Sequence, residues 1–479
     1  MKRNRKAKIL ATLGPVSSSL EIIEKMFLSG TDVFRLNFSH STIEEHRKNL
    51  ENIRSLEKKY NHSSCILADL QGPKLRIGNF SNQKEILKKG QKFIFDLKNE
   101  MGNNSRVYFP HKEIFKILTP NTIILIDDGK LKMQIIEQNA ESLILEVLNN
   151  GEISNNKGVN IPDAILPISS LTQKDKSDLI KITEMGFDWI AQSFVQSVDD
   201  VKELKKIVGG KALIMAKIEK PSAVKNIKDI INEADGIMIA RGDLGVEIAP
   251  EKVPSIQKKI ITECREMGKP VVVATQMLES MIENNTPTRA EASDVANAIY
   301  DGTDAVMLSG ESAIGMYPIE AVSMMNRIIE SVEKDKENYD LSNASENKKD
   351  KKVDTTQAIT SAAYTISQNA QAKAIITFSV SGKTTLRMSK QRALVQIVGI
   401  SPNLNTSRRL QIAWGVNSCH AEDANDATEM VRIACTIVKK KEIAKPNDAV
   451  VITAGVPFGN AGGTNLLRIA KIIADEDLS

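Results

Sequence analysis

The chain has few cysteines, few aromatic residues and no long apolar run. Its 479 residues include four cysteines, which show no C-x-x-C pair and no spacing typical of a metal site. They are expected to be free thiols in a reducing compartment, which excludes a disulfide scaffold. No apolar stretch approaches the roughly 20 residues needed to cross a bilayer, and the basic first residues do not resemble a signal peptide. These absences predict a soluble, cytoplasmic protein.

An excess of charge of one sign is also missing. The 64 lysines and arginines nearly balance the 60 aspartates and glutamates, which argues against nucleic acid or a membrane as the main partner. The length is too great for a single hydrophobic core, so roughly two to four domains are expected.

Short apolar runs alternate with amphipathic segments along most of the chain. Continuous apolar runs are typical of strands buried on both faces, as in a parallel sheet. Eight strands joined by crossover helices predict an α/β fold of the TIM (β/α)8 barrel type. An open doubly wound sheet is the alternative, but no G-x-G-x-x-G follows a strand. The eight runs are 7–14, 33–39, 65–72, 189–195, 213–219, 236–245, 270–276 and 305–310.

This alternation is interrupted once and ends in a charged segment. Residues 74–166 carry short β-type runs with tight turns, among them the hairpin signal Asp128-Gly129, and predict a small inserted β-barrel domain that acts as a lid. The catalytic barrel is then expected to comprise residues 1–73 and 167–340. The charged segment 341–354 is expected to be a solvated linker, and residues 355–479 a C-terminal α/β domain.

Polar side chains gather at the carboxyl ends of the eight runs, where TIM barrels place catalysis. Lys217 and Glu219 end one run, and Arg241, Gly242 and Asp243 end the next. Two carboxylates on neighbouring strands can share a hard divalent cation, and a lysine beside them can neutralise an anionic group on that metal. The pattern predicts chemistry on a phosphate or a carboxylate. Further polar residues at these ends are Arg35, Asn37, Ser39, Asp69, Arg76, Gln192, Ser193, Thr275, Gln276, Ser309, Glu311 and Ser312.

Six motifs, in this order, make the chain resemble the pyruvate kinases. No single motif is specific, but together they cover the predicted barrel, and the resemblance continues through the C-terminal domain. The motifs are Arg35-Leu-Asn-Phe-Ser-His40, Asp69-Leu-Gln-Gly-Pro-Lys-Leu-Arg76, Lys217-Ile-Glu219, Ala240-Arg-Gly-Asp-Leu-Gly-Val-Glu247, Ala274-Thr-Gln-Met-Leu-Glu-Ser-Met281 and Met307-Leu-Ser-Gly-Glu-Ser312.

The resemblance implies phosphoryl transfer from phosphoenolpyruvate to ADP, giving pyruvate and ATP. It implies that Glu219 and Asp243 bind Mg²⁺ or Mn²⁺ and that Lys217, assisted by Arg35, stabilises charge on the transferring group. Thr275 would bind the substrate carboxylate and help to deliver a proton to the enolate. The implied nucleotide-phosphate residues are Arg76, Lys174, Asn37 and His40, and the backbone at Gly242 would approach the substrate carboxylate.

One position departs from the commonest pattern of the family. Most potassium-activated members carry an acidic residue where this chain has Lys74, and members with the present pattern are potassium-independent. The ammonium of Lys74 can supply the positive charge that K⁺ would otherwise provide, so activity without K⁺ is expected. The family's monovalent-cation ligands are still present: the side chains of Asn37, Ser39 and Asp69 and the carbonyl of Leu70.

The C-terminal domain carries a loop that resembles a phosphate-binding loop. It is not a Walker A motif, because that motif needs glycine where Thr377 stands. The resemblance nevertheless implies a site for a phosphorylated allosteric effector, and it implies a homotetramer; ordinary turns in an effector-less domain are the alternative. The candidate effector residues are Ser379, Ser381, Gly382, Lys383 and Thr384, with Gly459 and Gly462 in a second glycine-rich loop.

Two other functional classes fit parts of the pattern. A metal-dependent lyase or aldolase uses similar Mg²⁺ carboxylates, but it leaves the inserted domain, Arg76 and Lys174 without a role. A catalytically dead phospho-ligand sensor would have lost Lys217, Glu219, Asp243 or Thr275, and all four are intact.

Overall fold

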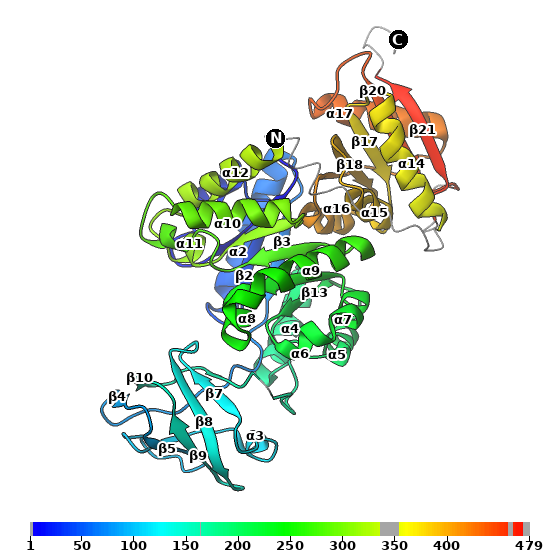
Figure 1. Ribbon diagram of the computed structural model, residues 1–479. Helices are drawn as coiled ribbons and strands as arrows, with labels where there is room; N and C mark the ends of the chain where they lie inside the picture. Colours follow the sequence, from blue (N-terminus) through cyan, green and yellow to red (C-terminus); the bar gives the residue numbers. More distant parts are fainter. Residues whose placement is uncertain (1–2, 163, 336–353, 458–462, 473–479) are drawn as a thin grey trace.

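The computed structural model describes residues 3–162, 164–335, 354–457 and 463–472. A parallel barrel lies in the middle of the molecule, with the inserted domain at one end and the C-terminal domain at the other (Figure 1). Among the described residues, no helix is long and apolar enough to cross a membrane.

The barrel confirms the predicted α/β fold. Its strands close in the order β1-β16-β15-β14-β13-β12-β3-β2, and every neighbouring pair is parallel. The strands are β1 (Lys8–Leu13), β2 (Val33–Asn37), β3 (Cys65–Asp69), β12 (Trp189–Gln192), β13 (Leu213–Ile218), β14 (Gly236–Ala240), β15 (Val271–Ala274) and β16 (Ala305–Leu308).

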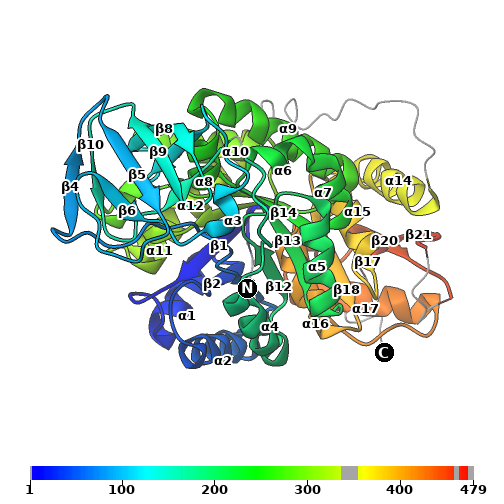
Figure 2. The same ribbon diagram turned by 90° about the horizontal axis from the view of Figure 1, so that it is seen from below.

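Amphipathic helices surround the barrel (Figure 2). Three of them begin at a threonine whose side chain accepts from a backbone N–H three residues later, while the acidic residue there bonds back to the threonine: Thr42, Thr172 and Thr288. The helices are α1 (Leu20–Ser29), α2 (Ile43–Tyr60), α4 (Gln173–Met185), α5 (Val198–Val208), α6 (Pro221–Lys225), α7 (Ile227–Glu233), α8 (Arg241–Glu247), α9 (Val253–Met267), α10 (Arg289–Tyr300), α11 (Gly310–Ala313) and α12 (Pro318–Lys334).

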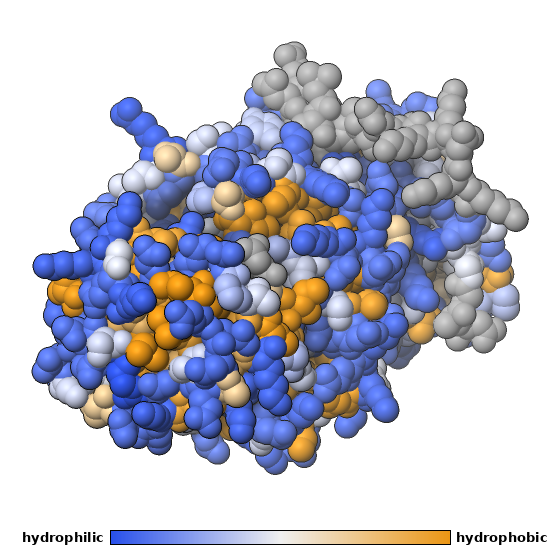
Figure 3. Space-filling view, turned by 60° about the horizontal axis from the view of Figure 1, so that its bottom comes forward, coloured by the Kyte–Doolittle hydropathy of each residue, from blue (hydrophilic) through white to orange (hydrophobic). Residues whose placement is uncertain are grey.

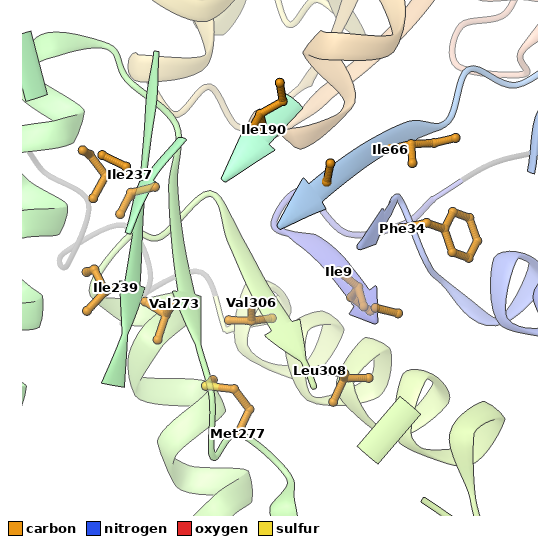
Figure 4. Packing of buried hydrophobic residues seen from close by; sticks show 14 of the residues in the cluster. Ile9, Phe34, Ile66, Ile190, Ile237, Ile239, Val273, Met277, Val306 and Leu308 are labelled. Atoms are coloured by element: carbon orange, nitrogen blue, oxygen red, sulfur yellow. The ribbon is translucent and has the colours of Figure 1, made fainter. Parts of the chain in front are cut away.

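Successive residues of each barrel strand point to two different cores. Ile9 and Val273 belong to the layer between strands and helices, whereas Leu10 and Val272 fill the barrel interior. Figure 4 shows part of the outer layer, including Ile9, Phe34 and Ile66 from three neighbouring strands. Both cores are fully buried, and each large side chain contributes roughly 1.5–3 kcal/mol to stability. Burial on both faces explains why the strands read as continuous apolar runs.

The inserted domain consists mainly of β-strands, with one short helix, and is less regular than the closed small barrel that the sequence predicts. Its strands form a six-stranded sheet, β11-β7-β8-β9-β5-β6, and a separate pair, β10-β4, because β4 and β10 bond to each other and not to the larger sheet. Asp128-Gly129 forms the predicted turn between β7 and β8, and both residues have positive φ. The elements are β4 (Lys84–Leu87), β5 (Lys92–Asp96), β6 (Arg106–Tyr108), α3 (Lys112–Phe115), β7 (Ile123–Ile126), β8 (Leu131–Gln138), β9 (Ser142–Val147), β10 (Gly151–Ser154) and β11 (Val159–Asn160).

The C-terminal domain is a five-stranded sheet in the order β19-β18-β17-β20-β21, covered by helices. It closes the amino-terminal end of the barrel: Ile412 packs into the barrel interior, and Trp189 at the start of β12 donates its indole N–H to the carbonyl of Arg409. The elements are α14 (Thr355–Asn369), β17 (Ala374–Phe378), α15 (Lys383–Lys390), β18 (Gln396–Ser401), α16 (Leu404–Arg409), the 3-10 helix Leu410–Ile412, β19 (Val416–His420), α17 (Ala427–Lys440), β20 (Ala449–Ala454) and β21 (Leu466–Lys471).

One predicted strand is shorter in the structure than in the sequence prediction, and one predicted segment lies almost entirely outside the described residues. The run 236–245 is a strand only to Ala240, after which Arg241–Glu247 turns into the helix α8. The predicted linker 341–354 lies outside the described residues except for Asp354, which caps the start of α14.

The surface is mixed in character. On the face seen in Figure 3, apolar side chains form patches between hydrophilic ones. The exposed large apolar residues come from different parts of the chain and include Ile86, Ile165, Ile180, Ile314 and Met316.

Candidate active site

Lys217 lies at the centre of a charged cluster at the carboxyl end of the barrel. Its Nζ is 3.2 Å from Asp69 Oδ1 and 3.0 Å from Glu219 Oε1, and it donates to Ser193 Oγ at 2.8 Å. Both carboxylates are 1 % exposed. Burial alone would lower the pKa of Lys217, but the two carboxylates outweigh it and raise that pKa above its ordinary value. The lysine is therefore held as a cation.

Arg35, on β2, completes the cluster from the opposite side of Asp69. Its Nε donates to Asp69 Oδ2 at 2.7 Å, and its Nη1 donates to Thr12 Oγ1 at 2.9 Å. Burial alone would raise the pKa of Asp69, but Lys217 and Arg35 together lower it. Asp69 is thus an ionised carboxylate that holds two cations in place.

Glu219 has the oxygen donors and the neighbouring carboxylate that suit a metal ligand. Its pKa is raised, first by burial and also by the nearby carboxylate of Asp243, while Lys217 works against the shift. A divalent cation would relieve this repulsion between two carboxylates, and oxygen is the donor that Mg²⁺ prefers. Within the described ranges, no group of three or more His, Cys, Asp or Glu side chains could hold a metal.

Thr275 has a backbone conformation that is rare for a β-branched residue. It has φ +70°, and Gln276, the next residue, has φ +56°. Arg241 donates to the carbonyl of Thr275 at 2.9 Å and pairs with Asp294 at 2.7 Å, which holds this turn in place. The Thr275 hydroxyl accepts from Gly242 N–H at 2.7 Å, so this N–H, expected to face a substrate carboxylate, is bonded to Thr275 instead.

Three of the nucleotide candidates lie near one another at the end of β2. Asn37 Oδ1 accepts from Ser39 N–H at 3.1 Å, and the carbonyl of His40 is 3.1 Å from His46 Nε2. Lys174 reaches this loop from α4 and donates to the carbonyl of Phe38 at 2.6 Å.

Arg76 and Lys74 lie instead at the inserted domain. Arg76 Nη1 donates to the carbonyl of Asn156 at 2.8 Å. The stem of Lys74 runs beside Gly158, where an added Cβ would be 3.0 Å from Lys74 Cε. The Leu70 carbonyl, expected to be a monovalent-cation ligand, accepts from Ser193 Oγ at 2.7 Å.

The candidate effector loop forms the start of α15. Gly382 precedes this helix with φ +82°, and Thr384 Oγ1 is 2.6 Å from Thr464 Oγ1. Ser379 is buried at the end of β17, whereas Ser381 and Lys383 are exposed. Gly459 and Gly462 lie outside the described residues.

The sequence reasoning missed Phe194. Its N–H donates to Glu219 Oε2 at 2.7 Å, and it does so from a backbone with φ +56°. A contribution made by a backbone N–H leaves no signal in side-chain chemistry. The tight space around Gly72, where an added Cβ would be 2.7 Å from the Phe194 ring, is likewise visible only in the fold.

Comparison with known proteins gives one consistent result. Residues 4–322 match the family model described as pyruvate kinase, barrel domain, and residues 357–470 match pyruvate kinase, alpha/beta domain. The chain is 46% identical to a pyruvate kinase of Methylorubrum extorquens over 472 residues, 98% of each chain. It is 41% identical to one of Clostridium perfringens, over 98% of this chain and 100% of the other.

A solved structure agrees with these relatives. A pyruvate kinase from Cryptosporidium parvum superposes with a TM-score of 0.91 at 34% identity, covering 98% of this chain and 96% of that one. The lyase and sensor alternatives therefore fall away.

Proposed function

The chain belongs to the pyruvate kinase family, and from that premise we propose that the cluster around Lys217 is the active site for phosphoryl transfer from phosphoenolpyruvate to ADP. The observation that carries the proposal is the shared lysine: the ammonium of Lys217 lies between two buried carboxylates, Asp69 and Glu219. Such charge is unfavourable in an interior unless it is paired or bound to a ligand.

We propose that Lys217 and Arg35 supply the positive charge for the transfer itself. The P–O bond to the enolate oxygen breaks and a new P–O bond forms to the terminal phosphate of ADP, with negative charge spread over the transferring oxygens. Lys217 stays protonated because of its raised pKa, so it acts as a fixed cation and not as a base. Glu219 and Asp243 would hold Mg²⁺, which when bound neutralises phosphate and carboxylate oxygens.

Thr275 is proposed to act at the enolate. Its hydroxyl accepts from Gly242 N–H and donates to the Ala274 carbonyl at 2.5 Å, so its orientation is set from both sides. The enolate left by phosphoryl transfer takes one proton at its methylene carbon to become pyruvate. A hydroxyl in this position would orient the water that supplies that proton.

Metal removal and replacement test this assignment. Chelation should abolish pyruvate formation, and Mg²⁺ or Mn²⁺ should restore it. Glu219→Gln should raise the metal concentration needed for half-maximal rate at least tenfold, because a ligand charge is lost. Glu184→Gln is the control, since it removes one carboxylate charge from an exposed pair with Lys181 on α4. Equal metal dependence in wild type and Glu219→Gln would refute the site.

We further propose that the enzyme works without K⁺, with Lys74 in the role of the monovalent cation. Replacing K⁺ by a large organic cation should leave most of the turnover. Lys74→Met should have a lower turnover than the wild type when the organic cation replaces K⁺. Addition of K⁺ should restore the turnover of this variant. Loss of most wild-type turnover without K⁺ would contradict the proposal.

We propose regulation and assembly from the resemblance to the family, and one loop of the structure supports the regulatory site. The loop before α15 offers hydroxyls and backbone N–H groups at a helix start, which suit a phosphate. A sugar phosphate or nucleoside monophosphate should shift the substrate saturation curve of the wild type and not of Thr384→Val. We propose a cytoplasmic homotetramer, and light scattering after gel filtration measures the subunit number. No shift with any phosphate would favour an effector-less domain.

A further inference from the structure

A buried ion pair at the junction between barrel and inserted domain has no part in the mechanism above. Glu247 ends α8, and its Oε1 accepts from Lys220 Nζ at 2.6 Å and from Asn160 Nδ2 at 2.8 Å. The Lys220 side chain is 6 % exposed and that of Glu247 1 %. Burying such a pair is unfavourable unless the geometry is good, so its position calls for a physical reason.

The three residues come from three different parts of the site. Lys220 directly follows Glu219 at the end of β13. Glu247 lies on the short helix whose first turn carries Asp243. Asn160 belongs to β11, the last strand of the inserted domain before the chain returns to the barrel. Glu247 Oε1 therefore connects three segments. They are the end of β13, next to Glu219, the helix α8 that carries Asp243, and the strand β11 of the inserted domain.

The junction also contains a hydrogen-bond acceptor without a partner among the described residues and a small cavity. Glu247 Oε2 has no hydrogen-bond partner among the described residues, although it is buried. A cavity of about 20 Å³ lies beside Lys220 and Asn160 and is lined by Lys74 as well, which is room for one water molecule. Glu247 thus keeps a second oxygen that could accept from Asn160 in another placement of the inserted domain.

We propose that Glu247 is a positioning residue that couples the placement of the inserted domain to the spacing of Glu219 and Asp243. The contact of Lys220 with Glu247 is the barrel arm of this coupling, because it ties Glu247 to the end of β13. The contact of Asn160 with Glu247 is the domain arm, because it ties Glu247 to the inserted domain. The proposal rests on the roles assigned above to the two carboxylates and to the inserted domain as a lid over the nucleotide. Each arm has its own measurable consequence.

The domain arm is tested by Asn160→Asp, which places a second carboxylate against Glu247. Repulsion should move the inserted domain away from Glu247, so KM for ADP should rise about tenfold while KM for phosphoenolpyruvate changes less than twofold. The control is Asn139→Asp, the same change at the turn between β8 and β9, where Asn139 Oδ1 accepts backbone N–H groups that an aspartate also serves. Asn139→Asp should leave both constants unchanged.

The barrel arm is tested by the double variant Lys220→Met with Glu247→Gln. It removes both charges together, while the introduced glutamine side chain keeps an oxygen for Asn160, so the domain arm survives. The dissociation constant of Mn²⁺, measured without substrates from the signal of free Mn²⁺ in electron paramagnetic resonance, should rise about tenfold. The control is Lys176→Met with Glu203→Gln, a surface pair at 3.0 Å, which should leave it unchanged.

Two results separate the coupling from the proposed function. Wild-type values of both Mn²⁺ affinity and KM for ADP in the junction variants would overturn the coupling. Undiminished Mn²⁺ binding by Glu219→Gln would overturn the metal site instead. If the double variant does not fold, as judged by circular dichroism, Asn160→Asp still decides: an unchanged KM for ADP refutes the coupling.

Discussion

Two lysines on barrel strands, one at each end of the barrel, have opposite electrostatic surroundings. Lys8 begins β1, donates to the carbonyl of Val416 at 2.6 Å and has a pKa lowered to about 8. Burial is the main cause, and the neighbouring cations Arg5 and Arg3 add to it against the opposing charge of Asp32. At the other end, carboxylates raise the pKa of Lys217, although burial works in the opposite direction.

The difference shows that arrangement, more than burial, separates a reactive end from a structural one. At the amino-terminal end, ion pairs join the barrel to the C-terminal domain, as Arg392 does with Asp304 at 3.0 Å and Arg408 with Glu57 at 2.6 Å. At the carboxyl end, two carboxylates share one lysine, and three non-glycine residues of the site have positive φ: Phe194, Thr275 and Gln276. Two carboxylates around one lysine mark the end that is built for a ligand, whereas positive φ occurs at both ends, as at Arg392.

The strongest test of this comparison removes each lysine in turn. Lys217→Met should lower kcat by about 10³- to 10⁵-fold, because the transferring phosphoryl group loses a fixed cation. Lys8→Met should leave kcat within about twofold. Steady-state pyruvate formation measures both, and circular dichroism verifies that each variant is folded. Comparable losses of kcat in the two variants would erase the distinction between the ends.

The second test breaks an ion pair at the structural end. Arg392→Met leaves Asp304 buried without its cation, which should cost about 3–5 kcal/mol of stability. KM and kcat should stay near wild type at temperatures where the variant is folded. Denaturant unfolding measures the loss, and Arg432→Met, which removes an exposed guanidinium paired to Glu429, should cost less than about 0.5 kcal/mol. A loss of kcat in folded Arg392→Met would show that this end also serves catalysis.

The third test concerns the strained threonine. Thr275→Val keeps the shape of the side chain but removes the hydroxyl, so kcat should fall about 10²-fold, within the usual range for a lost proton-transfer group. Thr275→Ser keeps the hydroxyl and should lose less than tenfold. Exchange of pyruvate methyl protons with solvent isolates the proton step from phosphoryl transfer. An exchange rate that is unchanged in Thr275→Val would remove Thr275 from that step.

The fold was predictable wherever burial leaves a mark on the sequence. All eight barrel strands read as apolar runs because they are covered on both faces. In the C-terminal sheet, β19 and β21 are the two edges. Edge strands such as Val416–His420 carry polar residues, so their pattern does not stand out.

The candidate site was predictable as a set of side chains but not as a network. Sequence order placed Lys217, Glu219 and Asp69 at strand ends, and barrel closure brings those ends together. The N–H of Phe194 on Glu219 and the clamp of Arg241 on the Thr275 turn depend on backbone geometry, which a residue pattern does not encode.

The smallest expected effect is a pH dependence that belongs to one lysine only. The folded-state pKa of Lys8, about 8, lies below its ordinary value of 10.5, so between these values the unfolded chain binds more protons and stability rises with pH. From pH 7 to 9.5 the wild type should gain on the order of 2 kcal/mol relative to Lys8→Met. Lys217, with its raised pKa, contributes stability that is fully present below pH 10.5 and is lost only above it. Urea unfolding of wild type and Lys8→Met at the two pH values measures the difference in the free energy of unfolding. Equal changes with pH in the two proteins would show that Lys8 keeps an ordinary pKa and would remove this contrast between the two ends of the barrel.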